Sequence, residues 1–239
     1  MKIKTFFAVL AAVVSASAVQ GAGNQLKPLN GKTYLTAHSG CERTKQNTIE
    51  SIEKGIRCGA DYIEFDLSFT ADGSPVLSHD RPKPGVKYES LENAFKTLKK
   101  YKGILFNVDV KSTVNLAAVK RMAVEAGIID RIFYSGIRAE DVEEMKRQSP
   151  GVPFFLNVNI GRRTNIDALI AHAKKIGARG LNLQYKGASA NLVKKCHKAG
   201  LEVSVWTVDN EKDIKRMFAL GVDNIASNKV VLSRKIIGP

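Results

Sequence analysis

Residues 61–80 read DYIEFDLSFTADGSPVLSHD, and the rest of the chain is organised around this stretch. Apolar and aromatic residues over 62–67 predict a β-strand, which two carboxylates, Glu64 and Asp66, interrupt. Residues two apart on a strand point to the same face, with about 7 Å between their Cα atoms. Two negative charges held that close favour a divalent cation between them, because hard cations bind carboxylate oxygens.

A turn at 71–74 and a second short strand at 75–78 follow the carboxylate pair. The second strand leads into His79 and Asp80. Two carboxylates on a strand that turns back to present a histidine predict an active site. The alternative is a surface strand with solvated acids, but such a strand would also be polar at position 62, where tyrosine only half fits.

The N-terminus has a composition of its own. Two lysines precede a short apolar run, and Ala16-Ser17-Ala18 is a small-residue cleavage pattern. These features predict a signal peptide over residues 1–21, a linker over 22–31 and a single domain over 32–239. The apolar run is too short for a permanent membrane span. We therefore expect an exported protein, periplasmic or secreted; the alternative is a retained N-terminal anchor.

The chain has a formal net charge of +14, and two of those positive charges lie in residues 1–21, which leaves about +12 on the mature protein. Such a charge favours anionic substrates and peripheral contact with an anionic membrane surface. No nucleic-acid partner is expected, because the basic residues are not interleaved with aromatic ones and no reader motif is present. The three cysteines are an odd number, which argues against a disulfide framework. No pattern specifies an oligomeric state.

Strands and helices are expected to alternate along the whole domain. Predicted strands cover residues 33–37, 62–67, 104–111, 131–135, 153–157, 180–184, 202–207 and 223–226. Predicted helices cover 48–58, 91–101, 116–126, 139–148, 165–176, 189–199 and 211–220. Eight βα units in roughly 200 residues predict a single-domain (β/α)₈ barrel of the α/β class. The alternative is a doubly wound open sheet, but no glycine-rich phosphate loop follows the first strand.

In such barrels the functional site lies at the carboxyl ends of the strands. We expect the strand bodies to be apolar and polar residues to converge on that mouth. The polar and aromatic residues at strand ends are His38, Glu64, Asp66, Asp109, Lys111, Asn157, Asn159, Gln184, Trp206 and Asn228.

Three carboxylates from adjacent strands, Glu64, Asp66 and Asp109, form an all-oxygen donor set. This set predicts one divalent cation, Mg²⁺ or Ca²⁺, as the cofactor. Two histidines near the predicted metal, His38 and His79, can act as general base and general acid. Lys111 supplies a positive charge for an anion. Metal, lysine and histidine pair together match the requirements of phosphoryl transfer.

Trp206 is expected either to line a ligand pocket or to fill the barrel. His172 and His197 fall within predicted helices, where surface or packing roles are expected.

Residues 32–230 resemble the glycerophosphodiester phosphodiesterase family. The resemblance is carried by TAHSG (36–40), QNTIESIEKGIRCGADYIEFDLSFTADGSPVLSHD (46–80), NVDVK (107–111), VSVWTVD (203–209) and GVDNIASN (221–228). It implies a metal-dependent (β/α)₈ barrel that hydrolyses glycerophosphodiesters to an alcohol and glycerol 3-phosphate. It also implies that Glu64, Asp66 and Asp109 hold the metal, that His38 and His79 are the acid–base pair, and that Lys111 contacts phosphate.

The chain departs from the family pattern around the mouth. Ser39 replaces the usual arginine, Gln46 the usual glutamate, Asp109 a longer glutamate and Ser227-Asn228 a Thr-Asp pair, and the insertion between strands two and three is reduced to 81–89. The Asp-x-Lys motif and short insertion are also similar to sphingomyelinase D-type phospholipases, which form cyclic phosphates. A third hypothesis is a barrel that binds phosphodiesters without turnover. The substrate on each reading is a small or lipid-derived phosphodiester.

Overall fold

The computed structural model describes residues 28–239. The predicted signal peptide, residues 1–21, and most of the predicted linker, 22–31, lie outside the described residues. The last linker residues contact the base of the barrel. The Leu29 amide donates to Asp223 Oδ1 (2.6 Å) and Asn30 Nδ2 donates to Glu202 Oε1 (3.0 Å). The last residues of the predicted linker are therefore part of the barrel domain, although their polar composition predicts a separate linker.

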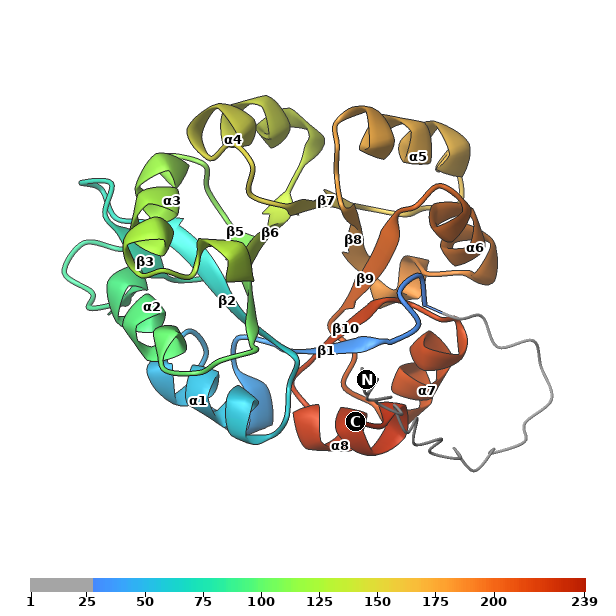
Figure 1. Ribbon diagram of the computed structural model, residues 1–239, viewed down its shortest axis with the longest axis horizontal. Coiled ribbons are helices and arrows are strands. Elements are labelled where there is room, and N and C mark those ends of the chain that lie inside the picture. The colour runs from blue at the N-terminus through green and yellow to red at the C-terminus, as the bar shows by residue number, and fades with distance from the viewer. Residues whose placement is uncertain (1–27) are drawn as a thin grey trace, which may run out of the picture.

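Eight parallel strands close into a barrel surrounded by helices (Figure 1), as the alternating pattern predicts. The closure comes from β1, which pairs with both β2 and β10. The barrel strands in spatial order are β1 (Tyr34–Ala37), β2 (Tyr62–Phe69), β5 (Leu105–Val110), β6 (Ile132–Ile137), β7 (Phe154–Val158), β8 (Gly180–Gln184), β9 (Glu202–Trp206) and β10 (Asn224–Ser227). The doubly wound alternative is excluded, because an open sheet has two unpaired edges.

A helix follows most barrel strands and returns the chain to the base of the barrel. The helices are α1 (Ile49–Arg57), α2 (Leu91–Lys99), α3 (Leu116–Glu125), α4 (Val142–Gln148), α5 (Ile166–Lys175), α6 (Ala190–Lys198), α7 (Glu211–Ala219) and α8 (Val230–Ile237). Short 3₁₀ turns lie at Cys41–Arg43, Ile129–Arg131, Ala139–Asp141 and Tyr185–Gly187. Six helices begin at a Ser, Thr or Asn whose side chain accepts a backbone N–H of the first turn, as Thr48 does for α1.

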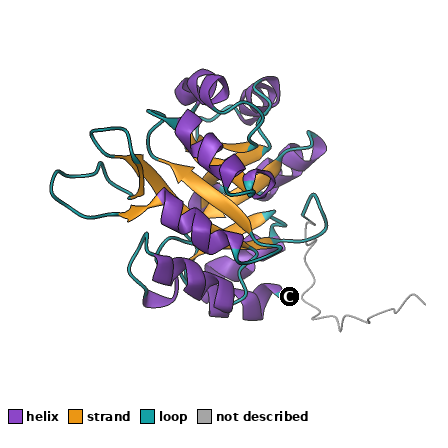
Figure 2. Cartoon of the chain, turned by 60° about the vertical axis from the view of Figure 1, so that its left-hand side comes forward, coloured by secondary structure: helices purple, strands orange, loops and turns teal. Residues whose placement is uncertain are grey.

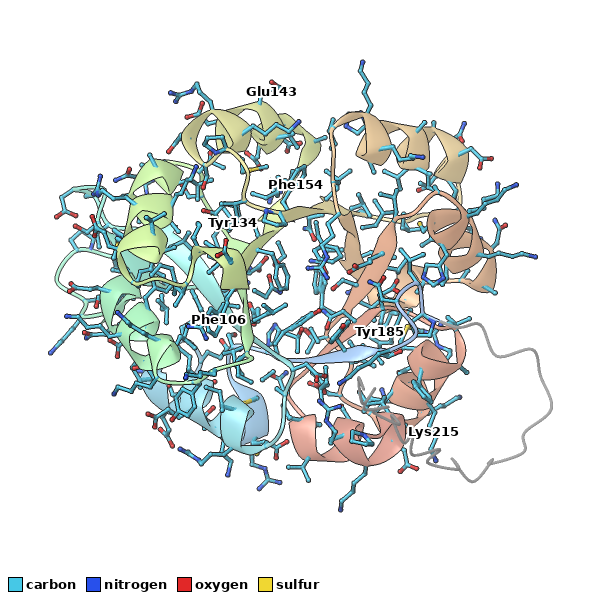
Figure 3. All side chains as sticks on the ribbon, in the orientation of Figure 1. Phe106, Tyr134, Glu143, Phe154, Tyr185 and Lys215 are labelled. Carbon is cyan, nitrogen blue, oxygen red and sulfur yellow. The ribbon has the colours of Figure 1, made fainter. Side chains whose placement is uncertain are left out.

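The main core lies between the strands and the helices. Phe106, Tyr134 and Phe154 are buried there, whereas Glu143 and Lys215 lie on outer helix surfaces (Figure 3). Apolar residues on the helix-facing side of each strand pack against the apolar stripes of the helices. This arrangement follows directly from the two periodicities of the sequence.

A second, smaller cluster fills the base of the barrel interior. Tyr62 stacks on Tyr34 at 4.9 Å between ring centroids and meets Phe133 edge-on at 5.3 Å, while Phe133 lies 5.6 Å from Phe155. Tyr62 points to the same side of β2 as the two carboxylates. Tyr62 therefore belongs to the barrel floor, and the solvated-strand reading of 61–80 is wrong because every residue of β2 is buried.

Above this aromatic floor the barrel interior is polar, so the expectation of apolar strand bodies is wrong for the inner faces. The buried inward residues there include Thr36, Asn107, Ser135, Asn182, Ser204 and Asn224. Several of them are joined by hydrogen bonds such as Asn224 Nδ2 to Ser204 Oγ (2.9 Å) and Asn182 Nδ2 to Asn157 Oδ1 (3.1 Å). These bonds offset the desolvation of the paired amides and hydroxyls, whereas Asn107 Oδ1 has no hydrogen-bond partner among the described residues.

Two features complete the predicted pattern. One is a hairpin arm, in which the predicted second short strand, β3 (Pro75–Leu77), pairs with the end of β2 and with a short β4 (Glu89–Ser90) that was not predicted. Its loops project on the opposite side of the molecule from the C-terminus (Figure 2). The other is α8, which closes the helical ring after the last strand. All three cysteines are free. Among the described residues, no helix combines the length and apolarity that a membrane span requires.

Asp61, which begins the 61–80 stretch, anchors the base of the barrel. Its Oδ1 accepts from Lys32 Nζ (3.0 Å), and its Oδ2 accepts from the Leu35 amide (2.9 Å) and Arg234 (2.8 Å). Burial acts to raise the pKa of Asp61, but the bonds from Arg234, Leu35 and Lys32 outweigh it and hold that pKa below its usual value of 3.8. One carboxylate thus links β1, β2 and α8.

We expect Asp61→Asn to destabilise the protein by about 1–3 kcal/mol near pH 7, because it removes a paired, partly buried charge. A carboxylate with a lowered pKa stabilises the fold above its unfolded pKa, and that contribution is lost as the pH falls through the folded pKa. The two urea unfolding curves should therefore converge below the ordinary aspartate value of 3.8. Asp130→Asn, at an exposed position, is the control; an equal loss in both variants would contradict the role of Asp61.

Candidate active site

Three carboxylates meet at the mouth of the barrel. Glu64 and Asp66 project from β2, and Asp109 projects from the neighbouring β5, where it is the register partner of Asp66. One ligand oxygen from each residue lies within 4.8 Å of the others. Glu64 and Asp66 are buried and Asp109 is half-buried. The parallel pairing of β2 with β5 therefore completes the cluster that the two-residue spacing began.

Each carboxylate is oriented by a neighbouring segment. The Ser39 amide, just after β1, donates to Glu64 Oε2 (2.7 Å). Asn47 makes two bonds to Asp66: its Nδ2 donates to Oδ2 (2.8 Å) and its Oδ1 accepts the Asp66 amide (2.9 Å). Ser135 Oγ, on β6, donates to Asp109 Oδ1 (2.8 Å). The carboxylates are thus held in fixed orientations.

Lys111 lies against two of the three carboxylates. Its Nζ is 2.9 Å from Asp66 Oδ1 and also binds Asp109 Oδ2. Burial acts to lower the pKa of Lys111, but the two carboxylates outweigh it and raise that pKa. Burial likewise acts to raise the pKa of Asp66, and the Lys111 ammonium with the Asn47 amide outweighs it and holds that pKa below its usual range.

Glu64 is different, because Lys111 is paired with the other two acids. Burial first, and the negative charges of Asp66 and Asp109 second, raise the pKa of Glu64 well above its usual range. Three carboxylates face a single ammonium group, so the cluster carries an excess of negative charge in a buried place. A divalent cation relieves such an excess, and an all-oxygen donor set suits Mg²⁺ or Ca²⁺. The residues present therefore fit a metal at Glu64, Asp66 and Asp109.

His38, at the end of β1, is oriented by residues from the other end of the chain. Asn228 Nδ2 donates to Asp209 Oδ2 (2.9 Å), so the amide oxygen of Asn228 faces His38. That oxygen, Asn228 Oδ1, lies 3.1 Å from His38 Nδ1. An amide oxygen only accepts, so Nδ1 carries the proton and Nε2 of the neutral ring has the lone pair. These hydrogen bonds set the His38 tautomer in which Nε2 can accept a proton, as the nitrogen of a general base must.

His79 lies after β3, on the loop of the hairpin arm. Its Nδ1 is 2.9 Å from Asp80 Oδ1, and both side chains are exposed. His79 nevertheless lines the same cavity as His38. That cavity has a volume of about 710 Å³ and is lined by His38, Gln46, Glu64, His79, Asn107, Asp109, Val110, Lys111, Ser112, Thr113, Ser135, Gly136, Arg138, Asp141, Asn157, Asn182, Trp206, Thr207 and Ala226.

The cavity brings together most of the residues that strand ends predict. Trp206 is one of the residues that line it. Four of the predicted residues do not line it, namely Asp66, Asn159, Gln184 and Asn228, and of these Asn159 and Gln184 are exposed. His172 is exposed, and His197 is mostly buried with its Nε2 2.8 Å from Asp223, in agreement with surface and packing roles.

Several site residues escaped sequence reasoning. Asn107 and Asn182 lie below the mouth on inner faces, where an apolar body was expected. Asn107 is two residues before Asp109, so the alternation of β5 was a usable signal. Asp209 and Asn47 act through other side chains, and only their neighbours in space reveal that role.

Gly136, on β6, allows β6 to pack closely against β5 beside Asp109. Its φ is 75°, and a Cβ there would lie 2.7 Å from Asp109 Oδ1 and 2.9 Å from the Val110 nitrogen. Both distances are shorter than real Cβ contacts. Only glycine therefore satisfies the backbone conformation and the position of the Asp109 carboxylate together.

We expect Gly136→Ala to destabilise the protein by about 2–4 kcal/mol, from backbone strain plus the clash, and to weaken metal binding by displacing Asp109. Gly127→Ala is the matched control, because Gly127 has φ 68° but nothing within 4 Å of its Cβ position. Urea unfolding and calorimetric titration with Mg²⁺ or Ca²⁺ measure the two effects. Equal losses in both variants would show that packing against Asp109 is unimportant.

Comparison with known proteins agrees with this geometry. Residues 30–87 and 83–232 match the model of the Glycerophosphoryl diester phosphodiesterase family. The chain belongs to this family. Its members are phosphoric diester hydrolases by description, and the resemblance noted in the sequence is confirmed.

One relative in this family matches most of the chain and another matches a short part of it. A glycerophosphodiester phosphodiesterase of Caldanaerobacter subterraneus subsp. tengcongensis is 24% identical over 233 residues, which cover 82% of this chain and 94% of that protein. Glycerophosphodiester phosphodiesterase 1 of Bos taurus is 40% identical over 55 residues, 23% of this chain and 17% of that protein.

Solved structures of phosphodiesterases share the barrel. A glycerophosphodiester phosphodiesterase from Parabacteroides distasonis has a TM-score of 0.74 and 26% identity, covering 86% of this chain and 97% of its own. A phosphodiesterase of Oleispira antarctica, solved with its product sn-glycerol-3-phosphate, has a TM-score of 0.77 at 18% identity, with 87% and 98% covered. The second likeness bears on the fold alone.

Proposed function

We propose that this chain is a divalent-metal-dependent phosphodiesterase that hydrolyses glycerophosphodiesters to an alcohol and glycerol 3-phosphate. The observation that carries the proposal is a cluster of three carboxylates, two of which line the same cavity of a family barrel as two histidines. The product named for the Oleispira antarctica phosphodiesterase is the one that this reaction would release. A carboxylate cluster without the histidines would support only binding.

His38 is assigned the role of general base. Its Nδ1 proton is held toward Asn228, which leaves Nε2 free to take a proton from the attacking hydroxyl. Asn228 and Asp209 are positioning residues, since they act on the reaction only through the orientation of the His38 ring. The hydroxyl that loses the proton belongs to water or to the substrate itself.

His79 is assigned the role of general acid. The Asp80 carboxylate beside Nδ1 matches an imidazolium, which carries a proton on each ring nitrogen. His79 then gives its Nε2 proton to the leaving alcohol oxygen. Its place on an exposed loop lets leaving groups of different size approach it.

Glu64, Asp66 and Asp109 would hold the divalent cation, whose charge polarises phosphoryl oxygens and neutralises charge in the transition state. Lys111, already at the edge of this cluster, provides a second positive charge for a phosphate oxygen. Trp206 lines the far side of the cavity, where an apolar ring can pack against the substrate and exclude water.

Phosphorus NMR of glycerophosphocholine incubated with the protein and either Mg²⁺ or Ca²⁺ tests the proposal. The expected result is loss of the diester signal and growth of a glycerol 3-phosphate signal, abolished by chelation. A cyclic phosphate instead would identify the sphingomyelinase D-type reaction. Calorimetric binding without any product would identify a barrel that has lost turnover.

We also propose that the protein is exported, with residues 1–21 as a signal peptide and the barrel beginning near residue 32. The support is the basic start, the apolar run and the small-residue pattern in the sequence. N-terminal sequencing of the protein recovered outside the cytoplasm of a bacterial host is the test. A full-length N-terminus on a cytoplasmic protein would refute export.

A further inference from the structure

The loop between β3 and β4 combines positive charge with an exposed apolar side chain. Residues 80–88 read DRPKPGVKY, and Arg81, Lys83 and Lys87 are all exposed. Val86, between the last two cations, is 51% exposed. Lys83 and Lys87 form no ion pair among the described residues.

This loop starts at the catalytic mouth. It follows directly after His79, which lines the cavity, and it belongs to the arm that projects on the opposite side from the C-terminus (Figure 2). Two prolines, Pro82 and Pro84, restrict its backbone, and the Lys83 amide donates to the Tyr88 hydroxyl (2.9 Å). The loop therefore presents Val86 from a defined structure.

A second exposed valine also lies on a loop that borders the mouth. Val114, after β5, is 68% exposed, and its neighbour Thr113 lines the cavity. Asn115 Nδ2 donates to the Gly73 carbonyl (3.1 Å), which attaches this segment to the β2–β3 turn of the arm. Exposed apolar side chains thus lie on two loops that border the mouth, with cations beside Val86.

We propose that this surface, formed by Arg81, Lys83, Val86, Lys87 and Val114, docks the mouth of the barrel onto an anionic lipid surface. The cations face lipid phosphates, and the two valines enter the boundary between headgroups and acyl chains. A lipid surface is the occupant that this chemistry fits, because isolated valines amid lysines lack the contiguous apolar patch of a protein interface. The inference goes beyond the proposed reaction, because docking would place the cavity where lipid-derived diesters are released.

Co-sedimentation of the whole protein with vesicles tests the proposal. The probes are pure phosphatidylcholine and phosphatidylcholine with about one third phosphatidylglycerol. The expected result is binding to the anionic vesicles only. The Lys83→Gln, Lys87→Gln double variant should bind about 25-fold more weakly, since each cation near an anionic surface contributes a factor of about five. Val86→Asp should bind about tenfold more weakly.

The matched controls lie at the other end of the barrel. Lys99→Gln with Lys100→Gln removes the same charge at the end of α2, and Val124→Asp changes a 53% exposed valine at the end of α3. Turnover of soluble glycerophosphocholine should stay unchanged in every variant, which separates this inference from the proposed reaction. Equal weakening by the control variants, or equal binding to both vesicle types, would overturn the docking surface.

Discussion

His38→Ala is expected to lower kcat for glycerophosphocholine by about 10²- to 10⁴-fold, the usual contribution of a positioned general base. The physical reason is the fixed ring: Asn228 accepts the Nδ1 proton, so the lone pair stays on Nε2, and no neighbouring group replaces it. KM should change little, because His38 acts on the proton that is transferred in the transition state and not on the bound diester. Phosphorus NMR time courses at saturating substrate measure the loss.

Two further variants test whether the loss of turnover is specific to His38 and its orientation. His172→Ala, on the exposed surface of α5, should retain wild-type turnover. Asn228→Ala should lose about tenfold in kcat, because the ring is then free to adopt the other tautomer. A His38→Ala enzyme that retained more than about a tenth of wild-type kcat would rule out base catalysis by this residue.

Glu64→Gln is expected to abolish turnover and, at the same time, to stabilise the metal-free protein. Glu64 is buried beside two like charges, and its amide analogue removes the repulsion while preserving shape and the bond from the Ser39 amide. The free energy of unfolding should rise by about 1 kcal/mol. The gain is small because protonation of Glu64 already relieves part of the repulsion in the wild type. The same change removes one of the three metal ligands.

Metal titration followed by thermal unfolding separates these effects without reference to activity. At a metal concentration about a hundred times its Kd, the wild-type protein should gain about 2.7 kcal/mol, and Glu64→Gln should gain almost nothing. Glu143→Gln, on the outer surface of α4, is the control and should follow the wild type. Equal metal stabilisation of wild type and Glu64→Gln would place the metal elsewhere.

Much of the fold could be predicted because it depends on local patterns. The alternation of strand and helix signals, with capping residues such as Thr48 and Ser90, specifies the barrel before any contact is known. The carboxylate pair of β2 follows from the two-residue period alone. The hairpin arm could be predicted only in part, because its turn and first strand have a sequence signature but β4 is only two residues long.

Other parts of the site could not be predicted, because they depend on pairings between distant segments. Asn228 reaches His38 only because β1 pairs with β10, and Asn47 reaches Asp66 only through the loop after β1. The polar inner faces were misjudged for a related reason. Whether Asn182 faces the helices or the barrel interior depends on how the strands tilt and close.

The sequence by itself determined the barrel and the set of groups that carry charge at the mouth, because these follow from residue type and from periods of two and 3.6 residues along one chain. The family followed from the resemblance of its motifs. Only the tertiary structure decided how those groups are paired. It placed Lys111 against Asp66 and Asp109, left Glu64 as the acid without a cation, and set the tautomer of His38. Pairing energies depend on distances across strands, and barrel closure sets those distances.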